Sequence, residues 1–177
     1  TKIDNLILIH GDTDHAGEAI NIINKIKVKN IIFNHDTFND LEAKIITALK
    51  KKKIDYYQAI KGLDFYNNKL YFINNELSDN ENDNSIVLYT SINGLKLLFM
   101  GDVGVDVEDK LIGTYNICNI DILKVGHHGS NTSTSLDFIN YTNPKYSIIS
   151  VGRNNRDNHP NDERLDSLKY TNINRTD

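Results

Sequence analysis

The chain has 177 residues, a formal net charge of −4 and 39% hydrophobic residues. This length fits a single domain, residues 1–177, that can bury a core without covalent staples, and the lone Cys118 excludes an internal disulfide. No apolar run approaches the ~20 residues that a membrane helix needs. The acidic balance argues against a broad electrostatic footprint for nucleic acid, so a phosphodiester would have to be drawn in by bound metal ions.

An aliphatic run over 6–9 ends in four potential metal ligands within six positions: His10, Asp12, Asp14 and His15. A loop held by a buried strand can aim several side chains at one point. Asp and His together suit Zn²⁺, Mn²⁺ or Fe. The alternative is a polar turn whose aspartates cap the next helix. That alternative has no use for two histidines, so the pattern favours a metal site.

The spacing of apolar residues predicts helices over 16–27 and from about 39, with a short buried strand at 30–34 between them. The second helix closes in four lysines, 50–53, which favour the negative end of the helix dipole. We interpret them as a solvated cap, with contact to a nucleic-acid backbone as the alternative. His35 and Asp36 are interpreted as a turn, because no further ligands lie nearby in the sequence.

Three β-rich segments follow at 56–60, 63–66 and 69–73, with a tight turn predicted at 67–68 and an exposed acidic loop over 74–84. Asn93-Gly94 predicts a hairpin between strands over 85–92 and 95–100. The second of these strands ends in Gly101-Asp102, so Asp102 can reach the same sheet edge as the first motif. A helix is predicted from 106.

A strand over 121–125 opens into Gly126-His127-His128-Gly129-Ser130, and Ser133 or Thr134 is expected to cap the next helix. A strand over 146–151 leads to a loop that ends in His159-Pro160, and 172–177 reads as a further strand. An apolar strand followed by His or Asp thus occurs four times. We expect these strand ends to converge at one edge of a sheet.

The sequence offers more candidate ligands than one metal ion binds. His10 and Asp12 on one side, Asp14 and His15 on the other and Asp102 as a bridge fit two divalent cations, Zn²⁺ or Mn²⁺, about 3.5 to 4 Å apart. Such a pair lowers the pKa of a shared water and stabilises attacking and leaving oxygens. The pattern indicates hydrolysis and no redox role.

The motif His10-x-Asp12-x-Asp14-His15 resembles the H-x-H-x-D-H signature of the metallo-β-lactamase superfamily, with Asp12 where the second histidine usually stands. The H-x-D-x-D-H form is similar to the metallo-β-lactamase-like domain of ComEC-type competence proteins, which import DNA. Segments 84–88, 98–102, 123–130, 149–152 and 159–160 resemble that domain's later motifs, in the same order. The resemblance implies an α/β fold, a metallo-β-lactamase-like αββα sandwich, here lacking some N-terminal and C-terminal strands.

The resemblance also implies roles for individual residues. The metal ligands would be His10, Asp12, Asp14, His15, Asp102 as the bridging carboxylate, and one of His127 and His128, with the choice between these two left open. The catalytic residues would be Asp14, His128 and His159, and His159 would bind metal or substrate. Binding of the scissile group would fall to Ser85, Ser130 and Asn155. The chain departs from the family pattern at Glu18, which replaces a glycine beside the cleft, and at Asp157-Asn158 before His159.

The sequence therefore predicts a metal-dependent hydrolase, a phosphodiesterase or nuclease that acts on DNA or a small phosphodiester through a metal-bridging hydroxide. One alternative is hydrolysis of β-lactams or other esters, which Asp12 and the His127-His128 pair disfavour. Another is a non-catalytic binding module that keeps the fold. The chain is expected to be soluble, cytoplasmic if complete and extracytoplasmic if cut from a membrane competence protein. Its oligomeric state stays open.

Overall fold

The computed structural model describes residues 1–60 and 70–177, so the strand predicted at 63–66 and the turn at 67–68 lie outside the described residues. The N-terminal elements are β1 (Lys2–Ile7), α1 (Thr13–Ala16), α2 (Ala19–Lys25), β2 (Lys27–Phe33), α3 (Asp40–Lys52) and β3 (Asp55–Gln58). The later strands are β4 (Leu70–Phe72), β5 (Leu88–Ile92), β6 (Leu95–Phe99), β7 (Ile122–Lys124), β8 (Tyr146–Ile149) and β9 (Asn172–Arg175). The later helices are η1 (Glu81–Asn84), α4 (Val105–Thr114), η2 (Gly126–Gly129), α5 (Leu136–Thr142) and α6 (Asp162–Ser167).

Strands β1, β2 and β3 form a parallel sheet in that order. Parallel neighbours need crossover connections, which α2 and α3 supply. The prediction of one helix over 16–27 is wrong, because α1 and α2 are separate helices on either side of 17–18. Asn39 begins α3 by accepting hydrogen bonds from the backbone N–H groups of Leu41 and Glu42, and Lys53 ends it with a left-handed backbone.

The second sheet has the order β4-β5-β6-β7-β8-β9 among the described residues, antiparallel from β4 to β6 and parallel from β6 to β9. The predicted hairpin is confirmed: Asn93 and Gly94 connect β5 and β6 with φ of 52° and 82°. The predicted C-terminal strand is confirmed as β9. Helix α6 was not predicted.

Two local predictions in this half are wrong. The cap of α5 is Ser135, whose hydroxyl accepts from the backbone N–H of Phe138. Ser133 and Thr134 are buried instead, and the Ser133 hydroxyl donates to the carbonyl of Gly126. The acidic loop over 74–84 is not uniformly exposed, because Asn74 and Asn84 are buried and hydrogen-bond the backbone around them.

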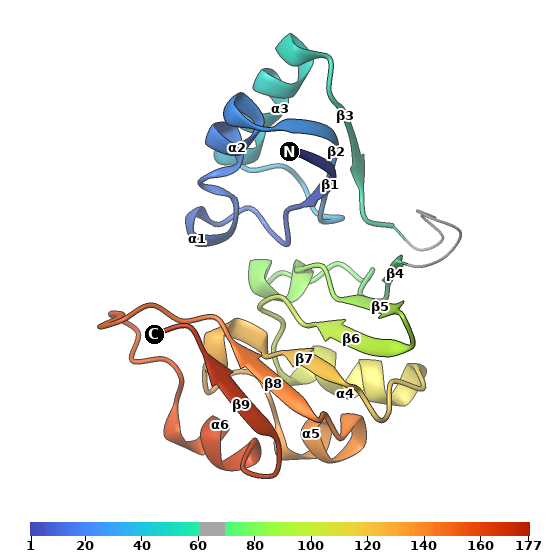
Figure 1. Ribbon diagram of the computed structural model, residues 1–177, viewed down its shortest axis with the longest axis vertical. Coiled ribbons are helices and arrows are strands. Elements are labelled where there is room, and N and C mark those ends of the chain that lie inside the picture. Colours follow the sequence, from blue (N-terminus) through green and yellow to red (C-terminus); the bar gives the residue numbers. More distant parts are fainter. Residues whose placement is uncertain (61–69) are drawn as a thin grey trace.

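Three hydrophobic clusters define four layers. One packs α2 and α3 on the small sheet, and another packs α4 and α5 on the large sheet. A third lies between the sheets and joins β2 to β4 and β5 through Ile32, Phe72 and Leu88. Helices thus cover the outer faces of two stacked sheets, as Figure 1 shows, and the predicted αββα fold is confirmed. In the described part of the chain, no helix combines the length and apolarity needed to cross a lipid bilayer.

The two sheets meet at Gly101. The backbone N–H of Ile86 donates to the carbonyl of Ile9 at 2.9 Å, which ties the segment before β5 to the segment after β1. Gly101 lies against this link with φ of +60°, and a Cβ atom there would stand 2.6 Å from Ile9 Cγ2 and 2.7 Å from Ser85 Cβ. Only glycine fits the conformation and the space at this junction.

We expect Gly101→Ala to destabilise the protein more than Gly94→Ala. Both positions have positive φ, which costs a non-glycine residue about 1–2 kcal/mol, but a Cβ at Gly94 meets no atom within 4 Å. The crowding at Gly101 should add about 1–3 kcal/mol. Urea unfolding of both variants measures the difference, and equal losses would show that the junction is not tightly packed.

Candidate metal centre

The predicted ligands come together where strands of both sheets end. His10 follows β1 of the small sheet, and Asp14 and His15 lie on α1. Asp102 follows β6 of the large sheet, and His128 lies in η2, directly after β7. The expectation that one sheet edge carries the site is therefore wrong, because the two sheets contribute opposite sides of it.

Four side chains form the centre of the cluster. Asp14, His15, Asp102 and His128 each place one potential ligand atom within 4.8 Å of the other three. His15 Nε2 is 3.1 Å from Asp102 Oδ2 and 3.2 Å from His128 Nε2. His128 Nε2 is also 3.6 Å from Asp14 Oδ2. Imidazole nitrogens and carboxylate oxygens that face one point in this way are a donor set suited to Zn²⁺ or Mn²⁺.

His10 and Asp12 extend the cluster on the side of β1. The rings of His10 and His15 have centroids 4.3 Å apart, and His10 Nε2 is 3.5 Å from Asp12 Oδ2. His10 is 1% exposed, yet its Nε2 has no hydrogen-bond partner among the described residues, and Asp102 Oδ1 is likewise buried without one. A buried polar atom without a partner costs free energy. Divalent cations beside these atoms would satisfy both, so the residues fit a metal centre.

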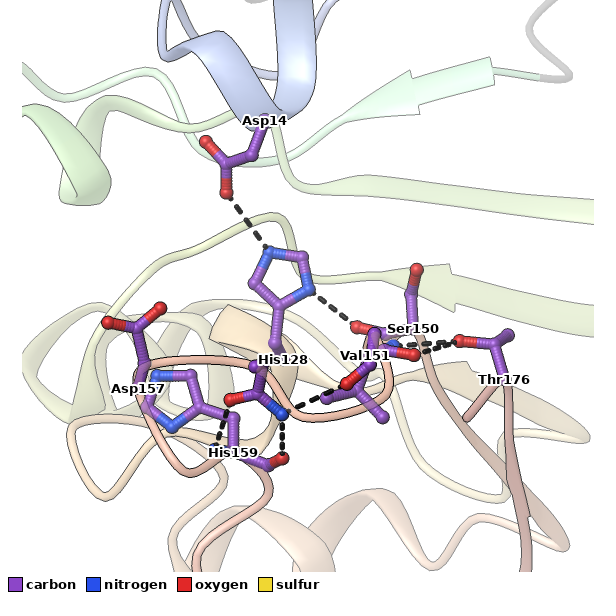
Figure 2. Close-up of a pocket in the computed structure, with 9 residues that line it drawn as sticks. Asp14, His128, Ser150, Val151, Asp157, His159 and Thr176 are labelled. Atoms are coloured by element: carbon purple, nitrogen blue, oxygen red, sulfur yellow. Dashed lines mark hydrogen bonds and ion pairs between the residues drawn. The ribbon is translucent and has the colours of Figure 1, made fainter.

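The two histidines of η2 differ in their contacts. His128 Nδ1 donates to the carbonyl of Ser150 at 2.6 Å, and Figure 2 shows the other ring nitrogen directed toward Asp14. Nε2 therefore keeps a lone pair on the side of the cluster. His127 Nδ1 lies 3.0 Å from the Thr132 hydroxyl, and its Nε2 is 4.0 Å from Asp102 Oδ2. The geometry thus places His128 inside the four-residue group and His127 beside it.

Charge and burial set the protonation of the central residues. Burial opposes the charge on Asp102, but the hydrogen bond from His15 and the nearby histidines outweigh it and hold the pKa of Asp102 at about 2. Burial lowers the pKa of His10, with a further contribution from His15. Burial also acts to lower the pKa of His15, but the hydrogen bond and charge of Asp102 raise it overall. Asp102 is therefore an anion, and His10 favours the neutral form that can ligate a metal.

Ser85 and Ser130 do not lie where a substrate contact needs them. Ser85 is fully buried, and its hydroxyl accepts from the backbone N–H of Asp102 and lies 3.3 Å from His10 Nδ1. Its oxygen can accept from both groups, which leaves His10 Nε2 free. Ser130 is 3% exposed and accepts from the hydroxyl of Thr132. We therefore interpret both serines as supports of the ligand loops.

A cavity of about 390 Å³ opens beside the cluster. Its lining includes Asp14 and His128 on one side and His159 and Asp157 on the other (Figure 2). The ring centroid of His159 lies 5.7 Å from that of His127. Asn155 also lines the cavity, but its amide is engaged by the backbone N–H and carbonyl of His159, so it shapes the loop.

Some residues of the site were not predicted. Ser150 and Thr176 line the cavity at the ends of β8 and β9, and Thr176 accepts from the N–H of Val151 and donates to its carbonyl. The position of Ser150 directly after an apolar strand could have marked it as a residue near the site. Its contact with His128, however, is made by its backbone carbonyl, which every residue type has, so the sequence could not predict this contact. His35 and Asp36 lie outside the cluster and contact the 74–84 loop instead.

The comparisons with known proteins identify the class. The sequence matches the family model of the metallo-beta-lactamase superfamily over residues 1–153, so the chain belongs to that superfamily. Membership assigns it to the metal-dependent hydrolases. A metallo hydrolase from the archaeon Ignicoccus hospitalis has the same fold, with a TM-score of 0.59 and 14% identity, over 99% of this chain and 77% of that chain.

Curated relatives define the branch more closely. The chain is 32% identical to ComE operon protein 3 of Bacillus subtilis, over 97% of this chain and 23% of that protein. It is 33% identical to competence protein ComA of Neisseria gonorrhoeae, over 90% of this chain and 21% of that protein. The chain therefore spans about a fifth of the length of these relatives. The predicted similarity to ComEC-type competence proteins is confirmed.

We expect Ser85→Ala to weaken metal binding without unfolding the protein. The change removes the oxygen that holds His10 and the backbone of Asp102, and loss of such outer contacts typically lowers metal affinity about 10–100-fold. Calorimetric titration with Zn²⁺ and with Mn²⁺ measures the effect. Ser91→Ala, at an exposed position of β5, is the matched control, and equal affinities for the two variants would contradict the positioning role.

Proposed function

We propose that the chain is a phosphodiesterase of the nuclease type that uses two divalent cations, Zn²⁺ or Mn²⁺, and acts on DNA or a small phosphodiester. The observation that carries the proposal is the cluster itself. Donor atoms from both sheets face one another, two of them are buried with no hydrogen bond to any described residue, and the group borders an open cavity. We also propose that residues 1–177 form one domain, which the hydrophobic cluster between the sheets supports.

The donor set divides into two groups around a shared carboxylate. Asp14, His15 and His128 would hold one cation, and His10 and Asp12 would hold the other. Asp102 would serve both, because its Oδ2 contacts His15 and His128 of the first group, and its Oδ1 is buried with no hydrogen-bond partner in the described part of the chain. Divalent cations in such a site supply Lewis acidity and activate water for attack on phosphorus.

The remaining residues act on the substrate and its protons. His159 lines the cavity, so we assign it a contact with an oxygen of the scissile group. His127 lies between His159 and Asp102 with its Nε2 outside the central group, a position suited to proton transfer to the leaving oxygen. Asp14, whose side chain is 64% exposed, reaches both the cluster and the cavity. His128 is held by Ser150 and orients the donor set.

DNA is the favoured polymer for two reasons. The relative from Neisseria gonorrhoeae is named a competence protein, which supports a DNA-related role. The cavity is also open to solvent and is partly lined by the loop that carries Asn155 and His159, which leaves room for a substrate larger than the cavity itself. Asp12 stands where the family usually has a histidine, so the donor set has one more carboxylate. Carboxylate oxygens suit hard cations such as Mn²⁺, which also bind phosphate oxygens.

We expect Asp102→Ala to lose both metal and activity. Removal of the shared carboxylate should cost more than the roughly 10–100-fold typical of outer contacts. Elemental analysis and hydrolysis of bis-p-nitrophenyl phosphate measure the two effects on the same preparation. Asp106→Asn, an exposed acid on α4, is the control, and full turnover by the Asp102→Ala protein would rule out the shared role.

Substrate preference separates the proposal from its alternatives. We expect turnover of bis-p-nitrophenyl phosphate and of single-stranded or double-stranded DNA, with Mn²⁺ and Zn²⁺ supplied separately, and no turnover of nitrocefin. Hydrolysis of nitrocefin without hydrolysis of any phosphodiester would identify a β-lactamase-like enzyme. Purified protein that holds little metal and hydrolyses nothing would identify a binding module.

A further inference from the structure

Basic residues gather at the end of the small sheet that lies away from the metal centre. Eight of the 20 lysine and arginine residues belong to this group. Its members are Lys2, Lys25, Lys27, Lys29, Lys50, Lys51, Lys52 and Lys53, here called the lysine end. All eight side chains are exposed.

The topology of the sheet brings these residues together. Lys2 opens β1 and pairs in register with Lys27, which opens the parallel strand β2. The crossover helices run back along the sheet, so α2 ends at Lys25 and α3 ends at Lys52, both at the edge where the next strand begins. Lysines about fifty positions apart in the sequence therefore lie at one edge of the sheet. The sequence analysis interpreted lysines 50–53 as the cap of one helix and did not predict this grouping.

The lysine end is far more positive than the rest of the molecule. Lys2 pairs with Asp4 at 3.1 Å, and the other seven lysines form no ion pair among the described residues. With Asp4 and Asp55 included, the end carries +6, whereas the whole chain carries −4, so the remainder carries −10. Cations in the last turn of a helix stabilise it by interacting with the negative end of the helix dipole, which accounts for the lysines that end α2 and α3. Capping of α2 and α3 does not account for lysines on β1 and β2.

The shape and chemistry of this end favour a polyanion. A surface hollow of about 520 Å³ is lined by four of these lysines together with Asp55 and four aliphatic residues: Lys27, Lys29, Lys52 and Lys53, and Ile23, Ile26, Val28 and Ile54. None of these four aliphatic side chains is among the large apolar side chains that are exposed in the described part of the chain. Attachment to a membrane surface by insertion uses exposed aromatic and aliphatic side chains beside the basic ones. Neutralisation of phosphates by lysine alone is typical of binding to a nucleic-acid backbone.

We propose that the lysine end binds the sugar–phosphate backbone of a nucleic acid, a second contact region remote from the metal centre. The choice of polymer rests on the proposed function. Lys2 opens β1 and His10 follows it, so the two regions are at most roughly 25 Å apart along this chain segment, at about 3.3 Å per residue of extended chain. Duplex DNA carries one charge per about 1.7 Å, so a duplex of roughly eight base pairs spans that distance. A nucleic acid long enough to reach both regions therefore binds more tightly because of the lysine end, whereas a small phosphodiester bound at the metal centre does not contact it.

The experiment compares two triple variants of equal charge. One is Lys27→Gln, Lys29→Gln, Lys52→Gln at the lysine end, and the other is Lys44→Gln, Lys110→Gln, Lys169→Gln at exposed positions elsewhere. Binding of fluorescent 20-base-pair DNA is measured in EDTA over a series of salt concentrations. We expect the first variant to bind at least about tenfold more weakly at low salt and to lose about 2–3 from the slope of log K against log salt.

Three results would overturn the proposal. They are unchanged DNA binding by the lysine-end variant, equal weakening by the two variants, and loss of binding to phosphatidylglycerol vesicles while DNA binding is intact. Thermal melting followed by circular dichroism confirms that both variants fold. Because EDTA removes catalysis from the binding assay, the two proposals fail separately. Absence of phosphodiester hydrolysis by the wild type would refute the proposed function, whereas the binding series tests the lysine end.

Discussion

The buried carboxylate of Asp102 is the contact on which the site depends. It lies at the junction of the two sheets and accepts from His15 at 3.1 Å, with His127 and His128 within 4.0 Å of the same oxygen. Its pKa of about 2 follows from those imidazoles, which outweigh the cost of burial. A carboxylate in this position is compatible with a folded protein only if cationic or metal partners face it. The junction therefore requires a polar, ligand-rich centre and not a continuous apolar core.

The loop after β7 stores backbone strain at the same place. His127 and His128 have φ of 43° and 54°, a left-handed conformation that costs about 1–2 kcal/mol per residue. The N–H of His127 donates to the carbonyl of Gly101, and the N–H of Ser130 donates to the carbonyl of His127. These bonds hold the loop to the end of β6, next to Asp102. The fold thus fixes the backbone that carries the two imidazoles, which is the kind of pre-organisation that a catalytic centre needs.

The charge distribution follows from the same topology. In a parallel sheet the strand ends that carry ligands and the strand starts that follow helix C-termini lie at opposite edges. The first edge of the small sheet carries His10 and the acidic side chains near it, and the second carries the lysine end. A polyanion is repelled by carboxylates near the metal centre unless cations neutralise them. Separate basic residues at the far edge provide attraction that does not depend on metal.

The sequence by itself determined the family, the αββα fold and the short segments that carry the candidate ligands, because each follows from local patterns: an apolar strand, then His10 to His15, Asp102 or His127-His128. The Asn93-Gly94 turn was predictable for the same reason, since its backbone requirement is local. Only the tertiary structure decided that the candidate ligands come from two sheets, that His128 enters the central group, and that Ser85 is buried beside His10. It also decided that lysines on β1, β2, α2 and α3 share one edge. These outcomes depend on contacts between residues far apart in the chain, and hydrophobic periodicity carries no record of which distant partner a side chain will meet.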